Sequence, residues 1–130
     1  MAKNKILFGG WATPVEAKTA NYTVKLRDCG KLLTNRGAGG TITFTLPVSA
    51  ASLKGFSIEF YTVAAQAIVI ASSPSDTLVV HADATADSVT TAATIGQHFK
   101  VVFDGTGWLV ISNPSAATTA TAVTAVTLAS

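Results

Sequence analysis

The sequence has little cysteine, little charge and no long hydrophobic run, and each shortage excludes a class of protein. Its single cysteine, Cys29, cannot form an intrachain disulfide, so the fold does not depend on an oxidising compartment. The apolar stretch that follows Lys5 is interrupted by Gly9 and Gly10, which makes it unlike a signal peptide and too short to cross a membrane. We therefore expect no membrane partner and a protein that is made in, and soluble in, a cytoplasm.

Charged residues make up 12% of the 130 residues, about half of their usual share in globular domains. A surface so poor in charge favours an oligomer or an assembly that covers part of it, although a monomer with a neutral Ser- and Thr-rich surface stays open. Residues 1–36 carry seven basic residues against two acidic ones, whereas residues 37–130 carry two against five. Because the basic residues are dispersed and lack interleaved aromatics, no nucleic-acid partner is predicted.

A strand-like alternation of apolar and polar residues recurs along the middle of the chain, where a helical period is hard to find. It is clearest in "TITFTLP" (41–47), "GFSIEFYTV" (55–63) and "HFKVVF" (98–103). The four residues "DGTG" (104–107) separate the last of these from "WLVIS" (108–112), which predicts a β-hairpin. We predict an all-β fold, a compact sandwich or barrel of about six to eight short antiparallel strands.

The two ends differ from this β-domain, which we place at residues 21–112. Residues 1–20 lack alternation but carry Phe8 and Trp11, so we predict an extended N-terminal arm whose aromatics need a surface to bury against. Residues 113–130 hold no charged residue and are rich in Ala and Thr. Such a C-terminal tail is either disordered or extended on a neighbour, and its Val and Leu residues favour the extended form.

The stretch "DCGKLLTNRGAGG" (28–40) contains four glycines and raises the question of a phosphate-binding loop. A P-loop needs G-x-x-x-x-G-K-[ST], but Leu32 follows Lys31, and no glycine stands five residues before Gly30. A dinucleotide fingerprint opens a helix, whereas a strand pattern follows these glycines. We therefore predict a turn between two strands in place of a phosphate cradle.

Structural turns account for the remaining glycines of interest. In the first turn, we predict positive-φ positions at Asn35, Gly37, Gly39 and Gly40. We also assign Gly105 and Gly107 to the turn of the β-hairpin.

The residues whose side chains could act in catalysis or bind a metal do not form a recognisable active site in the sequence. His81, Asp83 and Asp87 form a polar loop by their spacing, because a metal site needs three or four ligands in a fixed geometry. We interpret Cys29 as a buried structural thiol and find no Ser-His-Asp spacing from which a triad could be inferred. The sequence thus predicts a protein that is not an enzyme and that has no cofactor or metal.

Residues 21–112 resemble a small β-domain found in virion proteins of tailed bacteriophages. The matching segments are "YTVKLRDCGKLLTNRGAGGTITFTLP", "GFSIEFYTVAAQAIVIASSPSDTL" and "GQHFKVVFDGTGWLVIS". Their shared pattern includes an Asp-x-Gly-Lys opening, an Asn-x-Gly-Ala turn, a strand ending Leu-Pro, a later Asp and a closing Asp-Gly-Thr-Gly. Leu32 and Leu33 depart from it, since the family has an aromatic there. The resemblance implies a β-structured, often trimeric domain without catalytic residues.

Domains of this type occur in capsid decoration, head-fibre and tail-fibre proteins. We expect a capsid decoration (cement) protein, a homotrimer that binds the major capsid protein on the outside of the assembled shell and stabilises it. It would be made in the bacterial host cytoplasm and end on the virion surface. We assign capsid docking to Lys3, Lys5, Phe8 and Trp11, with the aromatics as anchors and the lysines for steering.

The alternative is a head-fibre or tail-fibre component that binds a receptor on the host surface. Fibre proteins usually carry a long repetitive shaft, and these 130 residues contain none. We also expect the 130 residues to be a complete small subunit, which favours the decoration protein.

Overall fold

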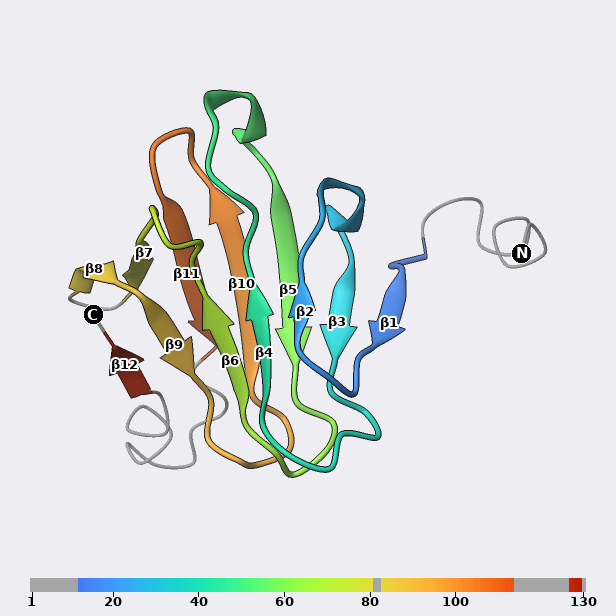
Figure 1. Ribbon diagram of the computed structural model, residues 1–130. Coiled ribbons are helices and arrows are strands. Elements are labelled where there is room, and N and C mark those ends of the chain that lie inside the picture. The colour runs from blue at the N-terminus through green and yellow to red at the C-terminus, as the bar shows by residue number, and fades with distance from the viewer. Residues whose placement is uncertain (1–11, 81–82, 114–126, 130) are drawn as a thin grey trace.

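The computed structural model describes residues 12–80, 83–113 and 127–129, which form two β-sheets (Figure 1). The first sheet has the order β1-β3-β5-β10-β11-β7-β8, and the second has the order β12-β9-β6-β4-β2. The strands are β1 (Val15–Ala17), β2 (Tyr22–Thr23), β3 (Leu32–Thr34), β4 (Ile42–Thr45), β5 (Ser57–Tyr61), β6 (Ile68–Ala71), β7 (Leu78–Val80), β8 (Asp83–Ala86), β9 (Ser88–Thr90), β10 (His98–Phe103), β11 (Trp108–Asn113) and β12 (Thr127–Ala129). Two short 3-10 turns, η1 (Leu26–Asp28) and η2 (Ala51–Leu53), interrupt them.

The chain winds between the two sheets in a solenoid-like manner. From β1 to β7 each strand lies in the opposite sheet to the one before it. Up to β6, neighbours within a sheet are therefore two strands apart in the chain. The pairs β1 with β3, β3 with β5, β2 with β4 and β4 with β6 are all parallel. The predicted all-antiparallel arrangement of about six to eight strands is wrong in these respects, because local alternation does not record which sheet receives the next strand.

The predicted β-hairpin is confirmed. Strands β10 and β11 pair antiparallel, and Phe103 stands opposite Trp108 across the turn at residues 104–107. The hairpin lies between β5 and β7 in the first sheet and joins the parallel strands on either side of it.

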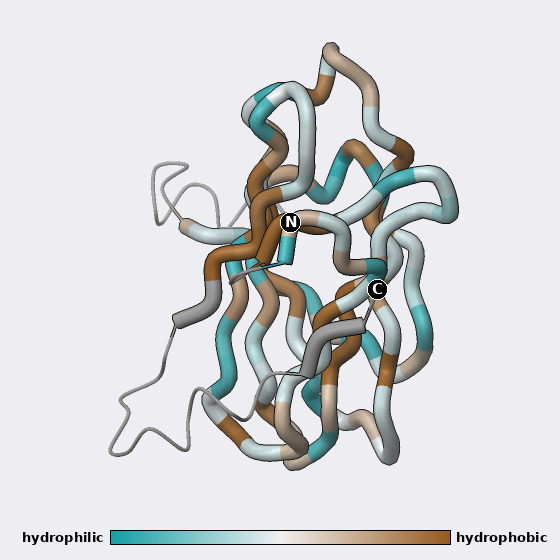
Figure 2. Tube along the Cα trace, turned by 90° about the vertical axis from the view of Figure 1, so that its left-hand side faces the viewer, coloured by the Kyte–Doolittle hydropathy of each residue, from teal (hydrophilic) through white to brown (hydrophobic). Residues whose placement is uncertain are grey.

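The core lies between the facing sheets. Residues at alternate strand positions are buried, as the patterns of β4 and β10 show, and apolar residues alternate with polar ones along the trace in Figure 2. Phe44 of the second sheet meets Phe60 of the first with ring centroids 5.0 Å apart. Near one end of the core, Trp108 packs against Phe56 and Phe103 and is completely buried. These burials confirm the apolar faces that the sequence indicated.

Parts of both predicted extensions belong to the sheets. Within the predicted arm, β1 is an edge strand of the first sheet, and its three residues pair with β3. Within the predicted tail, β12 pairs with β9 at the edge of the second sheet. Neither strand has the alternating apolar pattern that identifies a strand in sequence, so the places of residues 15–17 and 127–129 in the sheets were not recognisable.

Candidate functional site

The residues assigned to docking, Lys3, Lys5, Phe8 and Trp11, lie outside the described residues. The described part of the same segment begins at residue 12 and enters the first sheet through β1. Two other regions hold networks of side-chain hydrogen bonds that join separate segments of the chain. They are the edge cluster beside β1 and the loop end, where η2 and the turns at 72–77 and 104–107 gather (Figure 1).

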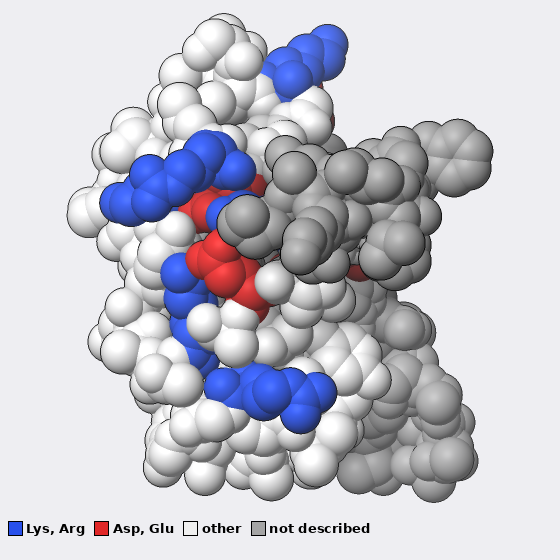
Figure 3. All heavy atoms as spheres, turned by 90° about the vertical axis from the view of Figure 1, so that its right-hand side faces the viewer, with Lys and Arg blue, Asp and Glu red and all other residues white. Residues whose placement is uncertain are grey.

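The edge cluster consists of Glu16, Lys18, Tyr22, Asp28 and Lys31. Lys31 Nζ lies 2.8 Å from Asp28 Oδ1 and 3.0 Å from Glu16 Oε2, and Lys18 Nζ lies 2.6 Å from Glu16 Oε1. The Tyr22 hydroxyl donates to Asp28 Oδ2 at 2.7 Å, and Lys18 Nζ sits 3.8 Å from the centre of the Tyr22 ring. The contacts form a closed circuit that joins β1, β2 and η1. Figure 3 shows basic side chains around acidic ones on this face.

Asp28 is the buried centre of the edge cluster. Burial by itself would raise its pKa, but hydrogen bonds from Lys31, the Lys25 amide and Tyr22 outweigh it and hold the pKa below its ordinary value. Hydrogen bonds to Asp28 and Glu16 raise the pKa of Lys31, and those from Lys18 and Lys31 lower the pKa of Glu16. The ionised cluster therefore fastens the edge strand to the domain.

The Asp-x-Gly-Lys segment is the local reason for this geometry. Cys29 and Gly30 are the central residues of a turn closed by the Lys31 amide, which donates to the Asp28 carbonyl at 3.0 Å. Gly30 has φ +83, as the third residue of a type II turn requires. Reversing the chain here returns Lys31 to the carboxylate three residues before it. Sequence reasoning treated Asp28 and Lys31 as part of a failed P-loop, although their spacing was the available signal.

Asn35, which we predicted as a positive-φ residue of the next turn, acts through the hydrogen bonds of its side chain. Its buried side chain donates to the carbonyls of Ala64 and Gln66 and accepts from the amides of Val63 and Ala64, all between 2.7 and 3.3 Å. Asn35 thus holds the distant loop between β5 and β6. Four backbone groups of that loop are satisfied by one amide side chain, which explains why an Asn stands there.

Of Gly37, Gly39 and Gly40, for which we predict positive φ, only Gly37 has it. Gly37 has φ +87 and Gly105 has φ +99, which are left-handed values that favour glycine. Gly39 and Gly40 lie in the bend before β4, but neither has such a φ, and a Cβ at either would meet no atom within 4 Å. The prediction of positive φ at these two positions is wrong because the turn closes earlier, between Asn35 and Ala38.

A carboxylate also shapes the hairpin turn. Asp104 Oδ1 accepts from the amides of Thr106 and Gly107, each at 2.8 Å, and these bonds lower the pKa of Asp104. Gly107 lies in the turn as predicted but without a left-handed φ. The side chain of Lys54, the residue that follows η2, covers Gly105 closely, since a Cβ there would lie 3.3 Å from Lys54 Cδ.

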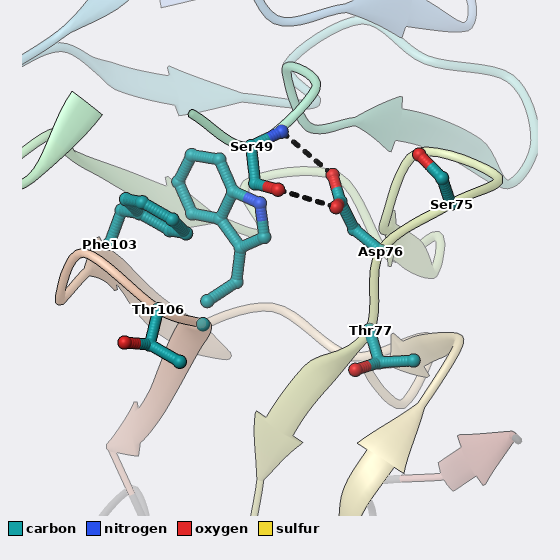
Figure 4. A pocket seen from close by; sticks show the side chains of 8 residues that line it. Ser49, Ser75, Asp76, Thr77, Phe103 and Thr106 are labelled. Carbon is teal, nitrogen blue, oxygen red and sulfur yellow. Dashed lines mark hydrogen bonds between the residues drawn. The ribbon is translucent and has the colours of Figure 1, made fainter. Parts of the chain in front are cut away.

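Asp76 fastens the loop end. Its Oδ2 accepts from the Ser49 amide at 2.8 Å, and its Oδ1 accepts from Ser49 Oγ at 2.6 Å (Figure 4). Oδ2 also accepts from Ser73 Oγ at 2.5 Å. Burial works to raise the pKa of Asp76, but the hydrogen bonds from Ser49 and Ser73 prevail and lower it. The carboxylate thereby joins the segment before η2 to the turn before β7.

A pocket of about 160 Å³ opens beside this carboxylate. We call it the Asp76 pocket. It is lined by Ser49, Ser75, Asp76, Thr77, Phe103, Thr106, Gly107 and Trp108. Trp108 is fully buried, and its Nε1 has no hydrogen-bond partner among the described residues. Sequence reasoning gave no sign of this pocket, because its lining comes from three separate loops.

The other chemically notable residues are dispersed. Cys29 is exposed, so the expectation of a buried thiol is wrong; it occupies a turn at the surface. His98 Nε2 lies 2.7 Å from Glu59 Oε1 on neighbouring strands, whereas His81 lies outside the described residues. Within the ranges the structure describes, no three His, Cys, Asp or Glu residues are placed to hold a metal ion, and no helix is long and apolar enough to cross a membrane.

No model of a protein family matches the chain, and no curated protein matches it.

Proposed function

We propose that the chain is a phage capsid decoration protein that binds the outside of an assembled shell and stabilises it. The observation that carries this proposal is that the polar residues in the segments that resemble the phage family have structural roles. Asp28 and Lys31, Asn35, Asp76 and Asp104 each hold a turn or fasten one segment to another. Their side chains are occupied by hydrogen bonds that hold the domain together. This supports a protein that acts by binding through its outer surface.

The β1 edge of the first sheet is the proposed route to the partner. Among the described residues β1 pairs only with β3, so the outer side of β1 presents unpaired backbone groups, and Val15 is largely exposed there. Open edges can accept a strand from another chain. The edge cluster keeps β1 in place, and we propose that Lys3, Lys5, Phe8 and Trp11 continue from it onto the major capsid protein.

Stabilisation of the shell would follow from mass action. A protein that binds only the intact shell lowers its free energy relative to the opened one, by an amount that grows with concentration. We further propose that the chain acts as a homotrimer, which would cover part of its weakly charged surface, and that its two facing sheets form a sandwich with solenoid-like winding.

Cosedimentation with undecorated capsids of the encoding phage tests the proposal. Wild-type protein should pellet with the capsids and raise the temperature at which they open. Trp11→Ala should speed dissociation, since an aromatic anchor is typically worth at least about 2 kcal/mol. Lys3→Glu with Lys5→Glu should mainly slow association, and Lys100→Glu, on an exposed position of β10, is the matched control.

Two results would refute the proposal. One is wild-type protein that stays in the supernatant at every concentration while light scattering shows it folded. The other is a chain lacking residues 1–11 that binds as tightly as the wild type, which would leave docking by this segment untenable. A melting curve of each variant separates lost docking from lost folding.

A further inference from the structure

The Asp76 pocket contains a buried donor that nothing in the described chain satisfies. A buried indole N–H without an acceptor costs free energy, and most native structures avoid it. Because Trp108 lines the pocket, a group that enters the pocket can supply the missing acceptor. The ligand must therefore carry a hydrogen-bond acceptor.

The carboxylate of Asp76 restricts which charge the ligand can carry. Three hydrogen bonds already reach its two oxygens, two at Oδ2 and one at Oδ1, so Oδ1 can still accept another donor. Its lowered pKa keeps it ionised near neutral pH, and it repels carboxylates and phosphates. An ammonium group has no acceptor for the indole N–H. The remaining class is a neutral group that both donates and accepts, such as a hydroxyl.

The rest of the lining favours several hydroxyls over one. Ser75, Thr77 and Thr106 line the pocket around Asp76, and their side-chain hydroxyls make no hydrogen bond within the described chain (Figure 4). Ser49 Oγ donates to Asp76 and keeps its own acceptor capacity. A ligand with hydroxyls in several directions would satisfy these groups together, whereas a single amide would reach few of them.

The size of the pocket sets the scale of the ligand. Its volume of about 160 Å³ is comparable to a cavity that accommodates a six-membered ring. We propose that the Asp76 pocket binds one sugar ring of a glycan, with ring hydroxyls accepting from Trp108 Nε1 and donating to Asp76. The site is part of the isolated domain, so this inference does not rest on capsid binding.

NMR of the indole N–H tests the inference directly. In a Trp11→Phe background Trp108 gives the single indole Nε1–H signal, because the chain has two tryptophans. Titration with glucose, galactose, mannose and N-acetylglucosamine should move this signal to saturation with at least one sugar. Single rings bind weakly, so we expect Kd on the order of 1 mM, about 4 kcal/mol of binding free energy.

Variants and other small molecules complete the test. Thr106→Val should weaken sugar binding at least about fivefold, roughly the loss of one hydrogen bond, without lowering the melting temperature. Thr43→Val on β4, in the other sheet, is the matched control and should bind as the parent does. If N-methylacetamide saturates the signal and no sugar does, the site recognises peptide and the inference is wrong. If nothing saturates the signal, the pocket holds only water and the inference is likewise overturned.

Discussion

Asp28 in the edge cluster and Asp76 at the loop end perform similar work with different partners. Each carboxylate accepts three hydrogen bonds that join separate segments of the chain. Asp28 is completely buried and has the ammonium of Lys31 among its donors, whereas Asp76 is only partly buried and its donors are neutral hydroxyls and an amide. The edge is therefore held by charge, and the loop end by neutral hydrogen bonds.

The difference shows how the cost of a buried carboxylate can be met in two ways. Full burial at Asp28 carries a large desolvation penalty, and a cation nearby offsets it. Partial exposure at Asp76 leaves a smaller penalty, which hydroxyl and amide donors can offset. The ion pairs around Asp28 attach β1 to the domain. The neutral hydrogen bonds at Asp76 leave its carboxylate able to accept a further donor beside Trp108.

Acid should weaken both regions at once and give the largest effect. The folded-state pKa values of Asp28 and Asp76 are lowered, so on acidification the unfolded chain takes up protons first. The stability that they confer is complete above roughly pH 4, the ordinary aspartate value, and is lost as the pH falls through their folded-state pKa values. Urea midpoints measured from neutral pH to about pH 2 should fall. In a chain with both Asp28→Asn and Asp76→Asn, the urea midpoint should depend less on pH.

Asp28→Asn should be the most destabilising single change. It leaves Lys31 without its buried counterion and gives Tyr22 and the Lys25 amide a poorer acceptor, so we expect a loss of about 3 kcal/mol in the free energy of unfolding. Glu16→Gln is the matched control in the same cluster. Glu16 is 40% exposed, and pairs of that kind contribute about 0–1 kcal/mol. Equal losses in urea denaturation would contradict the role of burial.

Asp76→Asn should cost less and respond differently to salt. Loss of hydrogen bonds from Ser49 and Ser73 should lower the free energy of unfolding by about 1–2 kcal/mol. This loss should be the same in dilute buffer and in about 1 M NaCl, where the Debye length is about 3 Å. The loss caused by Glu16→Gln should shrink in salt. A salt-dependent loss at Asp76 would remove the distinction between the two regions.

Glycine substitutions should give the smallest losses of stability. They compare the turn at Gly30, beside the edge cluster, with the hairpin turn at Gly105. Gly30→Ala places a side chain at φ +83 in open space, so backbone strain alone should cost about 1 kcal/mol. Gly105→Ala adds a close approach to Lys54 and should cost somewhat more. Gly39→Ala is the control, since it has neither a left-handed φ nor a neighbour within 4 Å, and its melting temperature should stay at or above that of the wild type.

The strands with regular alternation were predictable, and the pairing between them was not. Phe99, Val101 and Phe103 are buried, and the hairpin turn lies where the sequence indicated it. By contrast, β1 is three residues long, with only its middle residue partly buried. A strand so short carries no periodic signal, and its place is decided by pairing with β3 and by the edge cluster.

The candidate sites were less predictable than the strands for the same reason. The predicted positive φ is correct at Gly37 but wrong at Gly39, because a glycine-rich composition does not say where a turn closes. The role of Asn35 depends on a loop about thirty residues later in the chain. No local pattern carries that contact.

By itself the sequence determined the all-β character, the apolar faces of the long strands and the hairpin, because side-chain alternation and turn chemistry are local. Only the tertiary structure decided the parallel pairing between alternate strands, the edge cluster around Asp28 and the Asp76 pocket. Each of these depends on contacts between different strands, turns and loops of the folded chain. Their geometry follows from how the two sheets face each other, and this is set by the packing of the shared core as a whole.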